Sequence, residues 1–338
     1  MELLKKLKQR LRKEKKYLIS VKKSLSMLDK PKGTRIAILF DCIYCHLRFH
    51  TTAGEYFSYK LYNYKNRYRK NFMLRYYQQR HYWRVNNRKV TDSKYGFYKK
   101  MQKFFQRQMI SVPDCGEAEF LDFVQKHKKV ILKPDRGSLG LGIFVLCYEN
   151  DQQVLQCFRE IQNKMLCEEF ISQHHEMAAL NPYSVNTLRI ITIRHDAKNI
   201  EFISAALRIG AQPDSFVDNW AHNGIFAKVD IETGIVASFG IGHNNKKYAY
   251  HPLTGKQIIG MNLPNWPEVI HLIQKAHSEL DENPIIGWDI AITETGAEIV
   301  EANSAPGPDT MQLADLIPKG EKLLKIMNDK KRQKYHVH

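Results

Sequence analysis

The stretch GWDIAITETGAEIVEAN, residues 287–303, predicts two short β-strands joined by a tight turn at Gly296. Because side chains alternate between the two faces of a strand, Glu301 and Asn303 share a face, and a hairpin partner can place Asp289 opposite them. Both carboxylates lie among apolar residues, where an unpaired charge is costly. Their oxygens suit Mg²⁺. The stretch therefore predicts a magnesium site, with a hairpin of solvated carboxylates as the alternative.

The length and the cysteine content limit the kind of protein. At 338 residues the chain can form two or three compact units. It has no apolar run of about eighteen residues, and its basic start lacks the apolar segment of a signal peptide, so we expect a cytoplasmic protein. The six cysteines include one CxxC pair, Cys42 and Cys45, which predicts reduced thiols rather than structural zinc.

The positive charge is concentrated in the first third of the chain. Residues 1–108 hold 29 Lys and Arg against 6 Asp and Glu, while the whole chain has a net charge of +17. Residues 1–28 predict a basic amphipathic helix, since leucine and valine recur at heptad spacing. This helix would pack on its own domain, form a short coiled coil, or lie on an anionic membrane. The last alternative would make residues 1–35 a peripheral membrane contact.

Residues 36–110 predict a helical region rich in tyrosine and arginine. Interleaved basic and aromatic residues also hold single-stranded nucleic acid, but a helical subdomain with half-buried tyrosines explains the pattern better, so we do not expect nucleic acid as the partner. Saccharides or phosphorylated lipids would suit the same surface. A further helix is expected to begin near Lys94, with Thr91 or Asp92 as its N-cap.

From residue 111 onward, helical and strand patterns alternate, which predicts an α+β fold with antiparallel sheets covered by helices. Strands are expected at residues 130–133, 143–147, 165–171, 187–194, 200–209 and 224–230. Helices are expected at residues 118–127, 152–161, 267–280 and 309–327, before a frayed tail at 329–338.

A Gly-rich loop follows the strand that carries Lys133. Gly140, Gly142 and Ser138 allow backbone N–H groups to approach a polyphosphate, and Lys133 adds a positive charge. Because the lysine precedes the glycines and a strand follows them, the loop is neither a Walker P-loop nor a Rossmann turn. A plain tight turn is the alternative.

The segment CEEFI, residues 167–171, predicts a strand end that can offer backbone groups to an adenine edge and a carboxylate to ribose. An exposed acidic strand end is the alternative. Arg189 and Arg208 lie within apolar strands, so each is either paired or directed at an anion. His174 and His175 are expected to be loop histidines rather than metal ligands.

Taken in order, these pieces resemble the ATP-grasp superfamily. The wording EEFISQH, NTLRI, DNWAHNG, GWDIA and VEANSAPG is closest to its sugar-transfer-associated family, proposed to act in cell-surface polysaccharide biosynthesis. The resemblance covers roughly residues 40–320. It implies an ATP-grasp fold, in which two α+β lobes with antiparallel sheets, residues 111–175 and 176–328, enclose ATP behind a basic helical N-terminal region.

The resemblance also implies roles for single residues. The phosphate contacts would be Lys94, Lys133, Ser138, Gly140 and Gly142. The adenine and ribose contacts would be the backbone of Glu169, Phe170 and Ile171 and the carboxylate of Glu176, with Glu168 and Glu169 as alternatives for the carboxylate. The Mg²⁺ ligands would be Asp289, Glu301 and Asn303.

These roles imply an ATP- and Mg²⁺-dependent carboxylate–amine ligase that acts on a small molecule or saccharide. A substrate carboxylate would attack the γ-phosphorus, and an amine would then attack the acyl phosphate. Arg208, with Arg189 as second choice, would stabilise the anionic intermediate. An ATP-grasp kinase that phosphorylates a sugar and a non-catalytic binder of anionic polymers are the alternatives. The sequence makes no prediction about oligomeric state.

Overall fold

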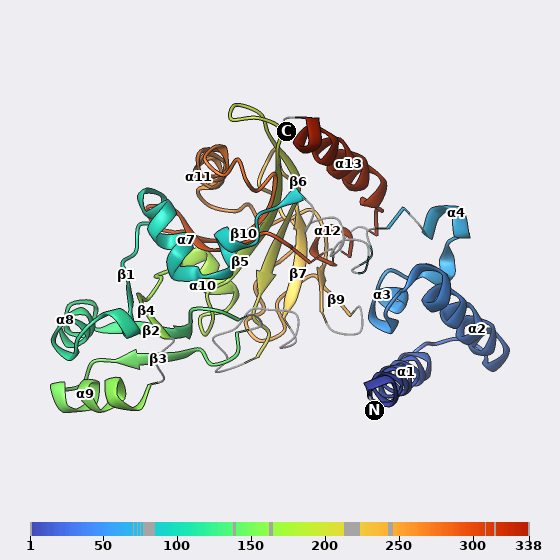
Figure 1. Ribbon diagram of the computed structural model, residues 1–338, viewed down its shortest axis with the longest axis horizontal. Helices are drawn as coiled ribbons and strands as arrows, with labels where there is room; N and C mark the ends of the chain where they lie inside the picture. Colours follow the sequence, from blue (N-terminus) through green and yellow to red (C-terminus); the bar gives the residue numbers. More distant parts are fainter. Residues whose placement is uncertain are drawn as a thin grey trace. The chain divides into compact units, whose positions relative to one another are not determined.

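The chain forms two compact units, residues 1–84 with 307–338, and residues 85–306. Both predicted lobes begin within the second unit, but residues 307–328 belong to the first unit rather than to the second lobe, and residues 85–110 belong to the second. The computed structural model (Figure 1) describes residues 2–69, 71–72, 74, 76, 85–137, 140–161, 165–212, 224–242, 246–307, 309–313 and 316–336.

The first unit is helical. Its helices are α1 (Glu2–Ser26), α2 (Lys32–Phe49), α3 (Ala53–Ser58), η1 (Leu61–Asn63), α4 (Asn66–Arg69), α12 (Asp309–Gln312) and α13 (Gly320–His336). One face of α1 packs within this unit: the Tyr17 hydroxyl donates to the Cys42 carbonyl at 3.0 Å, and its ring stacks on His46. A capping box begins α3, because Thr52 accepts the Glu55 N–H at 3.1 Å while the Glu55 carboxylate accepts the Thr52 N–H at 2.8 Å.

A partly buried ionic cluster holds the inner face of α2. The guanidinium of Arg69 donates to both Asp41 oxygens, at 2.6 and 2.9 Å, and to the Cys45 sulfur at 3.3 Å. Cys42 and Cys45 are buried free thiols. Burial raises the pKa of Cys42 to about 12 and that of Cys45 to about 11, which keeps both protonated at neutral pH.

The second unit contains a four-stranded antiparallel sheet in the order β1-β4-β2-β3. Two helices pack on the face of this sheet that carries Val130 and Leu132, through Phe120 and Val154 among others. Since strand side chains alternate, Lys133 projects from the opposite face. The elements are β1 (Met109–Ser111), η3 (Val112–Asp114), α8 (Glu117–His127), β2 (Lys129–Pro134), β3 (Phe144–Cys147), α9 (Asp151–Glu160) and β4 (Met165–Glu169).

A seven-stranded antiparallel sheet in the order β11-β10-β5-β6-β7-β8-β9 lies beside the first sheet in the same unit (Figure 1). Its strands are β5 (Thr187–Arg194), β6 (Ile200–Ile209), β7 (Ile225–Val229), β8 (Gly240–Ile241), β9 (Lys247–Tyr248), β10 (Ile285–Thr293) and β11 (Gly296–Asn303). The remaining helices of the unit are α6 (Lys89–Asp92), α7 (Lys94–Met101), η2 (Gln102–Phe104), α10 (His175–Leu180) and α11 (Trp266–Ser278).

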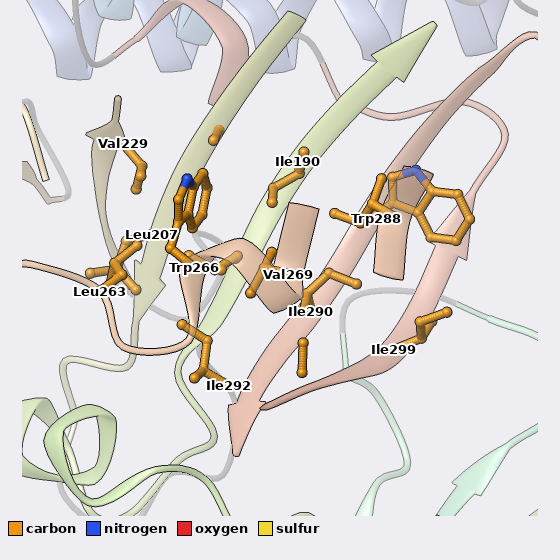
Figure 2. Packing of buried hydrophobic residues seen from close by; sticks show 14 of the residues in the cluster. Ile190, Leu207, Val229, Leu263, Trp266, Val269, Trp288, Ile290, Ile292 and Ile299 are labelled. Carbon is orange, nitrogen blue, oxygen red and sulfur yellow. The ribbon is translucent and has the colours of Figure 1, made fainter. Parts of the chain in front are cut away.

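The main core lies between the seven-stranded sheet and α11, where Val269 of the helix meets Ile190 and Ile290 of the strands (Figure 2). Trp288 is fully buried, and its indole N–H donates to the Thr192 hydroxyl at 2.8 Å. The same hydroxyl lies 2.8 Å from His277 Nδ1. This chain of hydrogen bonds satisfies polar groups inside the apolar layer between the sheet and α11.

Several local predictions differ from the structure. The helix at Lys94 is capped by Ser93, whose hydroxyl accepts the Gly96 N–H at 2.9 Å, and not by Thr91 or Asp92. Residues 329–336 continue α13 and are therefore not a frayed tail. The closing helix predicted at 309–327 is two helices, since Leu313 and residues 316–319 fall outside both. Within the described residues, no helix is long and apolar enough to cross a membrane.

Candidate nucleotide and metal site

The predicted metal ligands lie on the face of the seven-stranded sheet that points away from α11. Asp289 pairs with Glu301 across β10 and β11, and Gly287 pairs with Asn303. The neighbouring strand β5 brings Arg189 opposite Asp289. Three oxygen-bearing side chains and an arginine therefore share one face, as the strand period predicts.

A β-bulge at Val300 orients this face. Ile290 pairs with Ile299, but the next residue of the partner strand, Asp289, pairs with Glu301, so β11 has one extra residue. Without it, Glu301 would lie on the same face as Ile299, which is fully buried in the core. The bulge reverses the alternation and directs Glu301 and Asn303 away from the core.

Arginines hold Asp289 in its charged form. Arg189 forms a two-pronged pair with the carboxylate, one prong at 2.8 Å, and Arg208 donates to it at 3.0 Å. Burial works to raise the pKa of Asp289, but Arg189 and Arg208, assisted by the contact with Glu301, lower it to about 2. The two predicted catalytic arginines are thus both partners of the predicted metal carboxylate.

Lys133 lies on the four-stranded sheet and forms a buried ion pair with Glu168 at 2.7 Å. Both side chains are 5% exposed or less, so the pair is almost completely desolvated. Burial works to raise the pKa of Glu168, and the positive charges of Arg107 and Lys133 lower it instead. Burial lowers the pKa of Lys133, and the charges of Glu168 and of Glu301 on the other sheet work against that decrease.

Arg107 connects the two sheets. Its guanidinium donates to Glu168 on β4 at 3.1 Å and forms a second ion pair with Glu298 on β11. It also donates to the carbonyl oxygens of Ile299 and Val300, the latter at 3.1 Å, which are the carbonyls at the bulge. One buried cation therefore supports both the carboxylate beside Lys133 and the backbone that directs Glu301.

The Gly-rich loop is fastened to the start of α7. Asp135 accepts from the Ser93 hydroxyl at 3.0 Å and from the Tyr95 N–H at 2.9 Å. The ammonium of Lys94 donates to three loop carbonyls, including Gly137 at 3.1 Å. Lys94 and Gly137 line one cavity together with Glu301 and Asn303, so the structure brings this predicted phosphate contact to the predicted metal ligands.

Gly140 and Gly142 of the loop have φ values of 72° and 76°. Side chains rarely adopt this left-handed region, which explains the two glycines without a ligand and leaves their phosphate contact as a prediction. Ser138 lies outside the described residues.

The segment predicted to meet adenine is partly engaged by the protein itself. The N–H of Glu169 donates to the Gln108 carbonyl at 3.0 Å, and the N–H of Phe170 donates to the Lys129 carbonyl at 3.4 Å. These two donors are therefore not directed at a ligand here, and no comparable bond involves the N–H of Ile171 among the described residues. Glu176 is exposed in the first turn of α10, where a ribose contact stays a prediction.

Two histidines beside this segment meet a carboxylate of the β10–β11 turn. Glu294 accepts the His175 N–H at 2.7 Å and lies 3.4 Å from His174 Nε2. Their possible ligand atoms lie within 4.8 Å of one another. His174 Nδ1 accepts the Glu176 N–H, which leaves the proton of the neutral ring on Nε2, toward Glu294. The cluster is thus engaged by its own hydrogen bonds, and the two histidines lie at the N-cap and the first residue of α10 rather than in a loop as predicted.

The donor set fits Mg²⁺. Mg²⁺ favours one or two carboxylates with waters and substrate phosphates, and Asp289 and Glu301 supply two carboxylates on one face. Asn303 donates its amide N–H to Glu301 at 3.1 Å, a bond that does not use its amide oxygen. Asp289 keeps acceptor capacity beside its arginines, because a carboxylate has about four lone-pair positions.

Arg107, Glu298 and Asp135 were not predicted from the sequence as members of the site. Arg107 lies in a short polar connection, and its partners Glu168 and Glu298 are 61 and 191 residues away. Local sequence periodicity does not predict ion pairs between residues so far apart in the chain. The one signal was Glu298 itself, a carboxylate inside an apolar strand that needs a buried partner.

The antiparallel sheets, the Gly-rich loop after a lysine strand and the carboxylate hairpin together define an ATP-grasp fold. The chain belongs to the sugar-transfer associated ATP-grasp family, whose model matches residues 67–326. This confirms the resemblance drawn from the motifs. No curated protein sequence matches the chain.

Solved structures similar to this chain include three ligases. D-alanyl-alanine synthetase A from Vibrio cholerae is 10% identical with a TM-score of 0.45, and the match covers 72% of this chain and 66% of that one. D-alanine–D-alanine ligase from Helicobacter pylori is 16% identical with a TM-score of 0.41, and the match covers 71% of this chain and 61% of that one. Phosphoribosylamine–glycine ligase from Thermotoga maritima is 11% identical with a TM-score of 0.44, and the match covers 73% of this chain and 55% of that one. The chain thus spans less than two thirds of the length of each.

Proposed function

We propose that the protein is an ATP- and Mg²⁺-dependent ligase that joins a carboxylate to an amine with release of ADP and phosphate. The observation that carries the proposal is the polar face on β10 and β11, where an ionised Asp289 lies opposite Glu301, which lines one cavity with Lys94. Family membership supports the use of ATP. The family description also supports a saccharide substrate, so we propose a cell-surface polysaccharide or its sugar precursor as the target, modified in the cytoplasm where ATP is available.

In the proposed reaction, an oxygen of the substrate carboxylate attacks the γ-phosphorus of ATP, and the bond to the ADP oxygen breaks. The amine nitrogen then attacks the acyl carbon, phosphate leaves, and the nitrogen loses a proton. Mg²⁺, held by Asp289, Glu301 and Asn303, would neutralise the charge of the phosphates. Lys133 and Lys94 would bind the phosphate oxygens as fixed positive charges.

Arg189 and Arg208 have a positioning role in this proposal. Both guanidinium groups contact Asp289, which they keep ionised and fixed in direction. Arg208, with Arg189 as second choice, is also the candidate to stabilise the anionic intermediate.

Product analysis tests the proposal. The protein is incubated with ATP, Mg²⁺ and a panel of sugar acids, amino sugars and amino acids, and the products are identified by mass spectrometry. We expect ADP and phosphate only when a carboxylate and an amine are both present, and we expect Asp289→Asn to lose this turnover. Asp281→Asn, which changes an exposed carboxylate of the same unit, is the matched control.

Other products would favour the other functions. ADP formed together with a phosphorylated sugar would show a kinase, since the metal and lysine set serves both reactions. Absence of turnover across the panel, with salt-sensitive binding of an anionic polymer that survives Asp289→Asn, would show a non-catalytic binder.

A further inference from the structure

The helix α2 exposes an apolar face. Ile36, Phe40, Tyr44 and Leu47 recur at intervals of three and four residues, which places them along one side of a helix. Their exposed fractions are 49%, 68%, 43% and 71%. Two aromatic and two aliphatic side chains on one helix face are more apolar surface than a single scattered exposed residue would explain.

The opposite face of α2 is already packed. Ile38, Cys42, Cys45 and Phe49 are buried within the first unit. The helix is thus apolar on both sides, a pattern typical of helices that are covered all round. Within the described part of the first unit, the side chains of this second apolar face are largely exposed.

The helix that packs beside α2 is strongly basic. The sequence of α1 contains eight Lys and two Arg against two Glu. One of the glutamates, Glu14, is paired with His46 at 3.2 Å. The basic side chains of α1 that the structure shows to be exposed are Lys5, Lys8, Arg12, Lys13, Lys15, Lys16, Lys22 and Lys23.

We propose that the exposed face of α2 inserts into the surface of an anionic phospholipid membrane while the lysines of α1 contact the headgroups. Stable attachment to a membrane surface needs two signals, and an apolar face beside a polybasic segment supplies both. Each Lys or Arg near an anionic surface adds attraction, which salt weakens. The apolar part of this contact lies largely beyond residues 1–35, where the sequence alone placed a membrane contact.

Charge favours a membrane over a second copy of the chain. Two copies that met through α2 would bring two basic α1 helices toward each other, and like charges oppose such an approach. An anionic bilayer attracts the same helices. The proposal concerns the first unit and does not depend on the ligase reaction, whose groups lie in the second.

Vesicle co-sedimentation with the full chain tests this inference. Vesicles of phosphatidylcholine mixed with phosphatidylglycerol are compared with vesicles of phosphatidylcholine alone. We expect binding to the mixed vesicles only, weakened by salt. Phe40→Ser combined with Leu47→Ser should lower the partition coefficient by at least about tenfold, because two apolar anchors are lost. Leu253→Ser, which changes a 47% exposed leucine of the second unit, should leave it unchanged.

Charge reversal and a fluorescent probe complete the test. Lys15→Glu combined with Lys16→Glu should also weaken binding to the mixed vesicles. If the serine variant fails to fold, Phe40→Trp gives an independent reading, and its added emission should shift to shorter wavelength with mixed vesicles only. Equal binding by wild type and a folded serine variant, or no shift from Phe40→Trp, would overturn the inference. So would a dimer in lipid-free solution that the serine variant dissociates.

Discussion

Replacing Arg107 with methionine tests the view that one buried cation supports both sheets of the second unit. The substitution keeps a long side chain but removes the donors to Glu168, to Glu298 and to the carbonyls of Ile299 and Val300. Lys133 would remain as the partner of Glu168, and the Gln106 N–H, at 2.8 Å, as the partner of Glu298.

The expected loss of folding stability is large because the ion-pair network is almost completely shielded from solvent. The side chains of Arg107, Glu168 and Glu298 are 3%, 4% and 2% exposed. Removing one partner from a buried ion pair costs about 3–5 kcal/mol. For a unit of this size, that corresponds to a fall in Tm of about 10 °C.

The loss of stability in Arg107→Met should depend on pH. Burial raises the pKa of Glu298, and Arg107 works against that increase. Without Arg107 the pKa of the folded carboxyl rises further, so the folded state binds the proton that the unfolded state has released. Stability then falls as pH rises above the ordinary carboxyl value of 4.5. The fall in Tm should therefore be greater at about pH 8 than at about pH 5.

Thermal unfolding followed by circular dichroism at both pH values measures the effect. Arg159→Met is the matched control, because its pair with Glu117 is 65% and 46% exposed and should contribute little. If Arg107→Met changes Tm no more than Arg159→Met does, the network does not hold the sheets. As a positioning residue, Arg107 should also affect metal use, so the Mg²⁺ concentration that half-saturates ATP turnover should rise in the variant.

Three further substitutions test other parts of the second unit. Asp289→Asn should destabilise the protein at neutral pH, and the difference in Tm from wild type should shrink as pH falls from about 4 toward 2. The reason is that a carboxyl with a lowered pKa stabilises the fold only while it stays ionised. A Tm difference that stays constant across this pH range would show that the arginines do not keep Asp289 ionised. Burial lowers the pKa of His277 to about 4, so the unfolded state takes up a proton first as pH falls, and wild-type stability should decrease from about pH 6.5 to pH 4. Unfolding followed by tryptophan fluorescence should show this decrease in the wild type but not in His277→Gln. An equal dependence of stability on pH in the two proteins would contradict the reasoning. In Gly287→Ala the new Cβ would lie 2.4 Å from Cβ of Pro306, so we expect the free energy of unfolding, measured by chemical denaturation, to fall by about 1–3 kcal/mol. Gly255→Ser is the comparison, because its side chain would enter open space and only its left-handed φ would cause strain.

The sequence was a good guide to the strands of the second unit. Residues 187–194 and 200–209 form strands with the predicted boundaries, because alternating apolar residues are separated by the turn formers between Asp196 and Asn199. The hairpin pairing of Asp289 with Glu301 was also predicted correctly. The strand boundaries rest on local alternation, which the sequence displays directly, whereas the pairing of Asp289 with Glu301 also needs the bulge in β11.

Features set by distant contacts were not predictable in this way. Ile299 and Val300 are both apolar, and only the pairing with β10 and the bonds from Arg107 determine which of them is the extra residue. The run from Ile36 to Phe40 has apolar residues on every side, so neither strand nor helix period stands out, yet it forms the first half of α2. The N-cap of α7 was misplaced by one or two residues because Asp135, far along the chain, completes it.

The shared cation at Arg107 also constrains how this sequence can change over evolutionary time. An arginine whose two carboxylate partners lie on different sheets cannot be replaced alone, since Glu298 would be left without its counter-charge, whereas Glu168 would keep Lys133. Tolerated replacements must therefore arrive in combination, with position 298 becoming neutral when position 107 does. Among related proteins, these two positions should accordingly vary together, although they are far apart in the chain.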